Sequence, residues 1–314
     1  MTRYKYLGIV CTFAQAFLIA LNLSAETPAD TAKARSHPGS ESAASTPSPA
    51  TLVREVVYNE LHDHDAHGYW RYWIEKHQGR DSSVQEQIES TDGPVARIVT
   101  TNGQPVSSAV SAEEDRRLTH LLESPSEQAE HRKAYAEDEH RIGRILALLP
   151  DAFLYQPDGD QRLDGVLCHH LSFVPNPAYP AHSIEARIFH AMSGELWIGA
   201  DSKRLVRLDG QLQENVDFGY GILGRLYKGG WFRLERTEVG ANGGFGDWKT
   251  HRLEVHMQGR AILFKTIARE TSEVRGGFSP VPRLTLQQAV GMARSESHIA
   301  ANNPHGESAA LRHP

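Results

Sequence analysis

The chain has 314 residues and a formal net charge of −6, with 39 acidic residues against 33 lysines and arginines. This balance argues against nucleic acid as a general partner, because phosphate binding depends on clustered lysine and arginine. It also argues against simple adsorption to anionic lipid headgroups. The length is sufficient for one sizeable hydrophobic core.

The first 25 residues have the three parts of a removed secretory signal. Arg3 and Lys5 give a positive start, residues 7–21 are mainly apolar, and small residues follow up to Ala25. The apolar run is short for a membrane span, although retention as an uncleaved anchor is the alternative interpretation. We therefore expect a signal peptide over 1–25 and export to the periplasm of a Gram-negative envelope.

Two segments lack the apolar residues that a packed structure requires. Residues 26–50 are rich in alanine, serine, threonine and proline and contain no aromatic residue, and the tail over 296–314 is similarly polar. Such segments cannot bury enough apolar area to offset the entropy of ordering. We expect a disordered linker, a disordered tail, and a single folded domain over 51–295.

The folded region opens with a helix and then a group of strands. Apolar residues at helical spacing over 51–61 predict an amphipathic helix. Aromatic and alternating runs, with the turn signal Asp92-Gly93 between two of them, predict strands at 69–74, 84–90 and 95–101.

A charged helical insertion is predicted over 111–149. Ser111 with Glu114 forms a capping-box pattern, and Ser124-Pro125 repeats the start signal for a second helix. The first part of this second helix is highly charged. The charge run is typical of a solvated face.

After Asp151 the sequence predicts almost continuous β structure. Apolar and polar residues alternate, which is typical of strands with one buried face, and turn signals separate the runs. The expected fold class is mainly β with helices (α+β): a large curved antiparallel sheet, an unclosed half-barrel covered by helices. Strands are predicted at 152–156, 165–174, 184–191, 195–199, 203–208, 215–226, 231–239, 248–257 and 260–270, with a helix near 284–293.

Chemistry-bearing motifs are few. His62, His64 and His67 alternate with aspartates and are weak candidates for a metal site, the alternative being a polar loop between a helix and a strand. The sequence shows no nucleophile elbow and no phosphate-binding glycine loop. We therefore assign no catalytic residue and expect no cofactor. Cys168 would remain as a single cysteine after signal cleavage, and we interpret it as a small buried hydrophobic residue.

The aromatic residues give the better clue to a binding site. All five tryptophans lie in predicted strands or at strand ends. Large aromatic side chains are commonly core residues, but a curved sheet closed by helices can also enclose an apolar cavity. The candidates for lining such a cavity are Trp70, Trp73, Trp197, Phe218 and Trp231.

Part of the β region resembles a known family. The strings at 194–198 (GELWI), 203–210 (KRLVRLDG) and 231–235 (WFRLE), with the hairpin over 248–267, are similar to the repeated hairpins of outer-membrane lipoprotein-sorting proteins. The resemblance covers roughly residues 151–275 and, more loosely, residues 51–105. That superfamily includes the periplasmic lipoprotein carrier and its outer-membrane receptor. The resemblance implies an unclosed barrel with helices as a lid over an apolar cavity that holds acyl chains.

Three functional hypotheses follow. The first is a non-catalytic periplasmic carrier that binds lipid or the acyl chains of lipoproteins. The second is a structural or protein-interaction module of the envelope that docks a partner protein on the charged helices of 111–149. The third is a metal-dependent envelope hydrolase built on the His62–His67 cluster.

Overall fold

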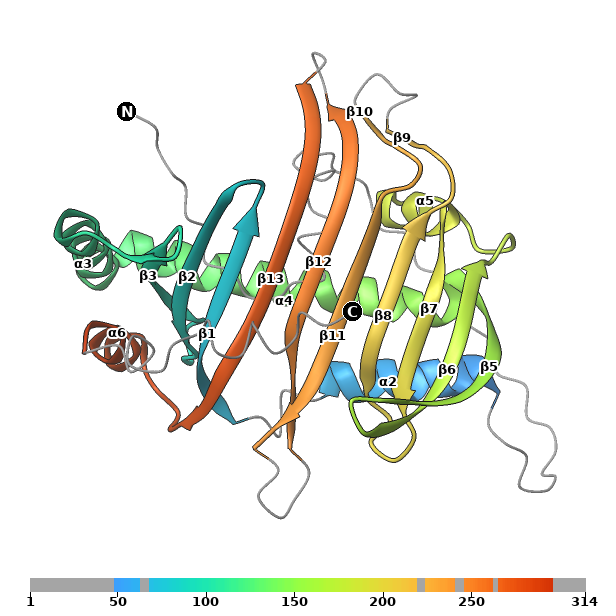
Figure 1. Ribbon diagram of the computed structural model, residues 1–314, viewed down its shortest axis with the longest axis horizontal. Helices are drawn as coiled ribbons and strands as arrows, with labels where there is room; N and C mark the ends of the chain where they lie inside the picture. Colours follow the sequence, from blue (N-terminus) through green and yellow to red (C-terminus); the bar gives the residue numbers. More distant parts are fainter. Residues whose placement is uncertain (1–47, 63–67, 219–223, 241–245, 262–264, 296–314) are drawn as a thin grey trace.

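The computed structural model describes residues 48–62, 68–218, 224–240, 246–261 and 265–295 (Figure 1). The expected signal peptide, nearly all of the expected linker and the expected tail lie outside these residues. Within the described ranges, no helix combines the length and the apolar character needed to cross a membrane.

The described strands form one antiparallel sheet of 13 strands whose order is β4-β3-β2-β1-β13-β12-β11-β8-β7-β6-β5. The short β9 and β10 pair with each other, and β10 also pairs with β12. The first and last strands of the domain, β1 and β13, pair directly and join the two meanders. The sheet stays open, with β4 and β5 at its two ends, as the sequence predicts. The strands are β1 (Tyr69–Gln78), β2 (Asp81–Ile88), β3 (Val95–Thr101), β4 (Gln104–Pro105), β5 (Phe153–Leu163), β6 (Val166–Pro175), β7 (Met192–Gly199), β8 (Leu205–Leu212), β9 (Val216–Phe218), β10 (Gly224–Leu226), β11 (Trp231–Val239), β12 (Asp247–Ala261) and β13 (Lys265–Val281).

Five helices are described, and a side-chain cap fixes the start of each. The hydroxyls of Ser48, Ser107, Ser124, Ser183 and Thr285 each accept a hydrogen bond from a backbone N–H in the first helical turn. Helix α3 therefore begins at Ser108, before Ser111, where the capping-box pattern predicts its start. The hydroxyl of Ser111 instead accepts a hydrogen bond from Arg97. The helices are α2 (Pro49–His62), α3 (Ser108–Glu123), α4 (Pro125–Ala152), α5 (Ile184–His190) and α6 (Leu286–Arg294).

The prediction of a strand over 184–191 is wrong, because this segment forms helix α5. Ser183 caps its start, and Ala186, Ile188 and Phe189 all become buried. Those positions follow helical and not alternating spacing, so one side of a short helix buries them together.

The sheet face that carries helices α2, α4 and α5, here called the inner face, holds the main core. One residue from each of five neighbouring strands stands directly opposite the next, forming a leucine row of Leu171, Leu196, Leu208, Leu234 and Leu253. All five are buried in one cluster with side chains of α2, α4 and α5. Burying each leucine stabilises the fold by about 1.5–3 kcal/mol.

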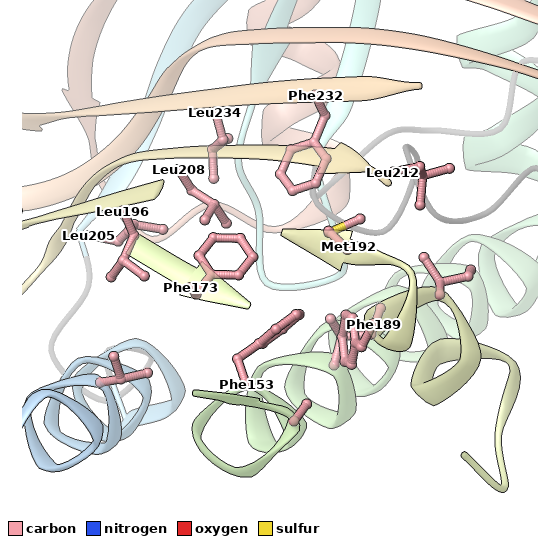
Figure 2. Close-up of a cluster of buried hydrophobic side chains, with 14 of the residues drawn as sticks. Phe153, Phe173, Phe189, Met192, Leu196, Leu205, Leu208, Leu212, Phe232 and Leu234 are labelled. Carbon is pink, nitrogen blue, oxygen red and sulfur yellow. The ribbon is translucent and has the colours of Figure 1, made fainter. Parts of the chain in front are cut away.

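Aromatic rings fill the space between the leucine row and the helices (Figure 2). The ring centroid of Phe153 lies 4.7 Å from that of Phe173 and 5.2 Å from that of Phe189. Gly194 and Gly210 stand opposite each other between Phe173 and Phe232. A β-carbon on Gly210 would lie 2.4 Å from Cε1 of Phe232. The absence of side chains at these glycines therefore leaves room for the rings.

We expect Gly210→Ala to lower the free energy of unfolding by about 1–3 kcal/mol, because the ring of Phe232 must move within a filled core. The matched control is Gly291→Ala in α6, where a β-carbon meets nothing within 4 Å. There alanine should raise the free energy of unfolding by about 0.5–1 kcal/mol, since glycine is the poorer helix former. Urea unfolding measures both changes, and equal values for the two variants would contradict this packing.

Candidate functional site

The inner face changes from apolar to charged where β12 meets β13. The residue opposite Leu253, at the end of the leucine row, is Glu273, and the residue opposite Glu273 on β1 is Lys76. Glu273 is 2% exposed, and its carboxylate lies 3.9 Å from Nζ of Lys76 and accepts a hydrogen bond of 3.1 Å from Arg275. The row continues through Ser83 and Thr101 without another apolar residue. Along this row the β1–β3 part of the inner face, here called the polar half, is polar.

An open cleft of about 1030 Å³ lies over this polar half. Strands β1–β3 form its floor, and α3 and the first half of α4 form its walls. The floor residues include Lys76, Gln78, Ser83, Gln85 and Ile98.

Helix α4 is packed at one end and not at the other, and this leaves the cleft open. It has 28 residues, about 42 Å at 1.5 Å per residue, and it crosses behind the sheet from α3 toward α5 and β5 (Figure 1). Its second half buries Ile145 and Ala152 in the main core. Between Pro125 and Glu137 it has no buried residue. Apolar burial therefore does not hold the first half against the sheet.

The turn between β2 and β3 contacts the first half of α4. Gly93 has a φ of +104°, and a β-carbon there would lie 3.1 Å from Tyr135 and 3.2 Å from Nε2 of His131. Glycine is needed at this position both for the positive φ and for the close approach of the helix. The contact fixes how far α4 stands from the strands.

Helix α3 closes the edge of β3 and supplies the second wall. The buried carboxylate of Glu114 accepts a hydrogen bond of 3.3 Å from the backbone N–H of Ile98, and Arg117 donates to the carbonyl of Ala96. Arg117 also pairs with Glu114 at 3.0 Å. These side chains bond to backbone groups of an edge strand that another strand could otherwise use. On its other side, Leu118 packs with Val290 of α6.

The lining of the cleft combines an apolar strip with charges of both signs. The strip consists of Pro94, Val95, Ala96, Ile98, Leu121 and Ala134. The charged and titratable lining residues are Lys76, Asp81, Glu113, Glu114, Arg116, Arg117, His120, Glu127, Glu130 and His131. Burial lowers the pKa of His131 below its ordinary 6.5, and this effect outweighs the raising effect of Asp92.

The structure does not bring the five aromatic candidates together. Trp70 packs with Tyr72 and Ile74, Trp197 lies in a separate cluster with Cys168, and Phe218 lies in the main core. The ring of Trp73 lies against Gly276 and Gly277, and Trp231 is exposed. None of the five lines the cleft. Their assignment as ligand-binding residues stays a prediction.

The metal hypothesis concerns residues at the end of α2. His62 is exposed, and its Nδ1 lies 2.8 Å from the carbonyl oxygen of Tyr58. His64 and His67 lie outside the described residues. Among the residues that the structure describes, no group of three or more His, Cys, Asp or Glu side chains could hold a metal ion.

Sequence reasoning missed the residues that line the cleft. In the sequence Glu114 gives only a helix-start signal, and the charged run that contains His131 has the pattern of a solvated face. One signal was present: His131 and Tyr135 are four residues apart and share a helix face. Lys76 gave no signal, because its environment depends on the pairing of β1 with β13.

Fold and site together define an open antiparallel sheet with helices on its inner face and a cleft at the polar half of that face. No family model matches the chain, and no curated protein matches it.

The chain is similar to several solved structures at low identity. A DUF1329 family protein from Desulfovibrio piger is 10% identical, with a TM-score of 0.27 over 76% of this chain and 95% of that chain. A putative outer membrane lipoprotein-sorting protein domain from Vibrio parahaemolyticus is 9% identical, with a TM-score of 0.31 over 75% and 95%. A LolA superfamily protein from Nitrosomonas europaea is 8% identical, with a TM-score of 0.24 over 73% and 92%.

The descriptions of the last two structures name the lipoprotein-sorting superfamily that the hairpin pattern resembles.

We expect His131→Gln to reduce the loss of stability on acidification. Because the pKa of His131 is lower in the folded protein, the unfolded chain binds the proton more readily, and the free energy of unfolding falls as the pH drops through 6.5. Urea unfolding at about pH 7.5 and pH 5 measures the difference. Burial also lowers the pKa of His251, so part of the loss should remain in the variant.

The matched control is His120→Gln, which removes an exposed imidazole from the wall of the same cleft. A His131→Gln variant that loses as much stability on acidification as the unaltered protein would contradict the assignment.

Proposed function

We propose that the protein is a non-catalytic carrier of the periplasm that holds an amphipathic ligand, a lipid or the acylated end of a protein, in the cleft between β1–β3 and helices α3 and α4. The observation that carries the proposal is the open cleft of about 1030 Å³ over a floor that the leucine row does not reach. Its volume is at the upper end of the usual range for ligand pockets, about 300–1,000 Å³.

The apolar strip supports the acyl part of the proposal. Val95, Ala96 and Ile98 lie along β3, Leu121 lies on α3, and Ala134 faces the cleft from α4. A chain lying along this strip would gain about 0.8 kcal/mol for each buried methylene. One acyl chain gives weak, reversible binding on this scale, which suits a carrier that must release its ligand.

The charges of both signs favour acylated protein over free anionic lipid. Carboxylates outnumber lysine and arginine side chains in the lining, and would disfavour a lipid phosphate. A polypeptide next to an acyl group offers amide donors and acceptors that can pair with Glu113, Arg116 and Gln85. A ligand with an apolar acyl end and a peptide end therefore matches this lining best.

The proposed ligand position differs from the one that the family resemblance implies. The resemblance puts acyl chains between the sheet and its helical lid, but over the leucine row that space is filled by Phe153, Phe173 and Phe189 (Figure 2). The ligand would lie instead beyond the edge of this core, under the unpacked half of α4. Location in the periplasm rests on the signal pattern over 1–25.

The charged helices favour a second candidate, an envelope interaction module. Exposed ion pairs such as Lys133–Glu137 and Arg116–Glu113 lie on α4 and α3. Exposed pairs contribute little to stability, with a median of about 0–1 kcal/mol. A partner protein could therefore exchange them for pairs of its own, and would then occupy the helices without any lipid in the cleft.

Native mass spectrometry of the protein isolated from its own periplasm separates the two functions. The carrier predicts a bound lipid or acyl peptide in stoichiometric amount. The bare protein mass, from a preparation never exposed to detergent, would overturn the carrier in favour of the interaction module.

The matched variants are Ala134→Trp and Ala136→Trp, two residues apart on α4. Ala134 lines the cleft, whereas Ala136 is exposed and does not. A tryptophan at 134 should fill the cleft and reduce bound ligand at least about tenfold, the equivalent of about 1.4 kcal/mol. A tryptophan at 136 should leave it unchanged. Equal loss in both variants would show that the ligand does not occupy the cleft.

A further inference from the structure

The face of the sheet opposite the leucine row, here called the outer face, has a shallow hollow of about 330 Å³. Strands β7, β8 and β11 form it. Two rows of directly opposed residues border it. One row runs Ser193, Gln211, Trp231 and His256, and the next runs Glu195, Asp209, Arg233 and Glu254.

Trp231 stands at this hollow as an exposed flat ring. It is 38% exposed, although the other four tryptophans are buried. The ring of His256 on the neighbouring strand lies parallel to it, with an interplanar angle of 11° and a centroid distance of 6.1 Å. A large exposed indole at a hollow marks a surface suited to a ligand with one apolar face.

Polar side chains with unused hydrogen-bonding groups border the same ring. Gln211 stands directly opposite Trp231, and Ser193 directly opposite Gln211. The described residues give no hydrogen-bond partner to the side-chain amide of Gln211 or to the hydroxyl of Ser193. An amide and a hydroxyl can each both donate and accept a hydrogen bond.

Two arginines hold the acidic side chain of the hollow in place. Asp209 accepts hydrogen bonds from Arg207, at 2.6 Å, and from Arg233, at 3.1 Å and 3.2 Å. Burial opposes ionisation of Asp209, but these arginines outweigh it and lower the pKa of the carboxyl below its usual range. Asp209 is therefore a fixed, charged acceptor at neutral pH. Glu195, opposite Asp209, is half exposed and adds a second carboxylate.

We propose that this hollow binds a carbohydrate chain, with one sugar ring stacked on Trp231. A sugar ring has one face of C–H groups that can lie on an indole, and a rim of hydroxyls that both donate and accept. The hollow supplies both complements, the ring of Trp231 and the polar groups of Gln211, Ser193 and Glu195. An acyl chain would leave these polar groups unpaired. A phosphate would meet the carboxylate of Glu195, and the arginine of the hollow, Arg233, is already paired with Asp209.

The site does not depend on the proposed carrier function, because it lies on the other face of the sheet from the cleft. The protein from residue 26 onward would be titrated with chitotriose and with maltotriose. Saturation-transfer NMR and calorimetry would measure the binding. We expect one of these trisaccharides to bind with a Kd in the millimolar range or tighter. If neither trisaccharide binds at about ten millimolar, the binding free energy is less favourable than about −2.7 kcal/mol, and the proposal is overturned.

Matched variants test whether binding occurs at the hollow. Trp231→Ala should weaken binding about tenfold, and Trp231→Phe, which keeps a flat ring, should recover most of it. Tyr58→Ala is the control, because Tyr58 is 61% exposed and lies on α2, outside the hollow. The cleft-filling Ala134→Trp variant should bind the sugar normally. Equal binding by Trp231→Ala and the unaltered protein would overturn the proposal.

Discussion

The pairing of Leu253 with Glu273 is the point on which the rest of the structure depends. On one side of it the leucine row seals the inner face against α2, α4 and α5. On the other side, buried Glu273 meets Lys76 and Arg275, and such a charged group stays buried only while it is paired. An apolar helix face over this row would meet a paired charge and polar side chains, so it would gain little from apolar burial. The main core, with its leucine row, therefore stops at β12, and the cleft lies beyond β13.

The same boundary divides helix α4 into two parts with different stability. Its second half is part of the main core, so it can detach only when that core opens. Its first half rests on the Gly93 turn and on exposed ion pairs such as Arg132–Asp92. Segments with few buried apolar contacts open at low free energy. This combination suits a carrier: the second half of α4 keeps the fold rigid, and the first half can open at low free energy to admit a ligand.

The sequence predicted the fold class well, because that prediction rests on local patterns. Alternation gave most strands, and Ser124-Pro125 gave the start of α4. The prediction of a strand over 184–191 failed because a short apolar run fits a strand or a helix equally well. The cleft could not be predicted, since Lys76 and Glu273 meet only through a pairing of distant strands. The side of the sheet on which each tryptophan lies also depends on β-bulges. One extra residue, Val206, separates the pairs Trp197–Arg207 and Ile198–Leu205, and it shares a cluster with Trp197 on the outer face.

We propose that the ligand lies over the polar half of the inner face and not over the leucine row. An atomic-resolution structure of the protein isolated with its natural ligand tests this most directly. We expect the ligand to lie between Gln85 on the sheet and Tyr135 on α4, with Phe153 and Phe173 still in contact. A ligand found between Leu208 and Phe153, with the aromatic rings displaced, would contradict it.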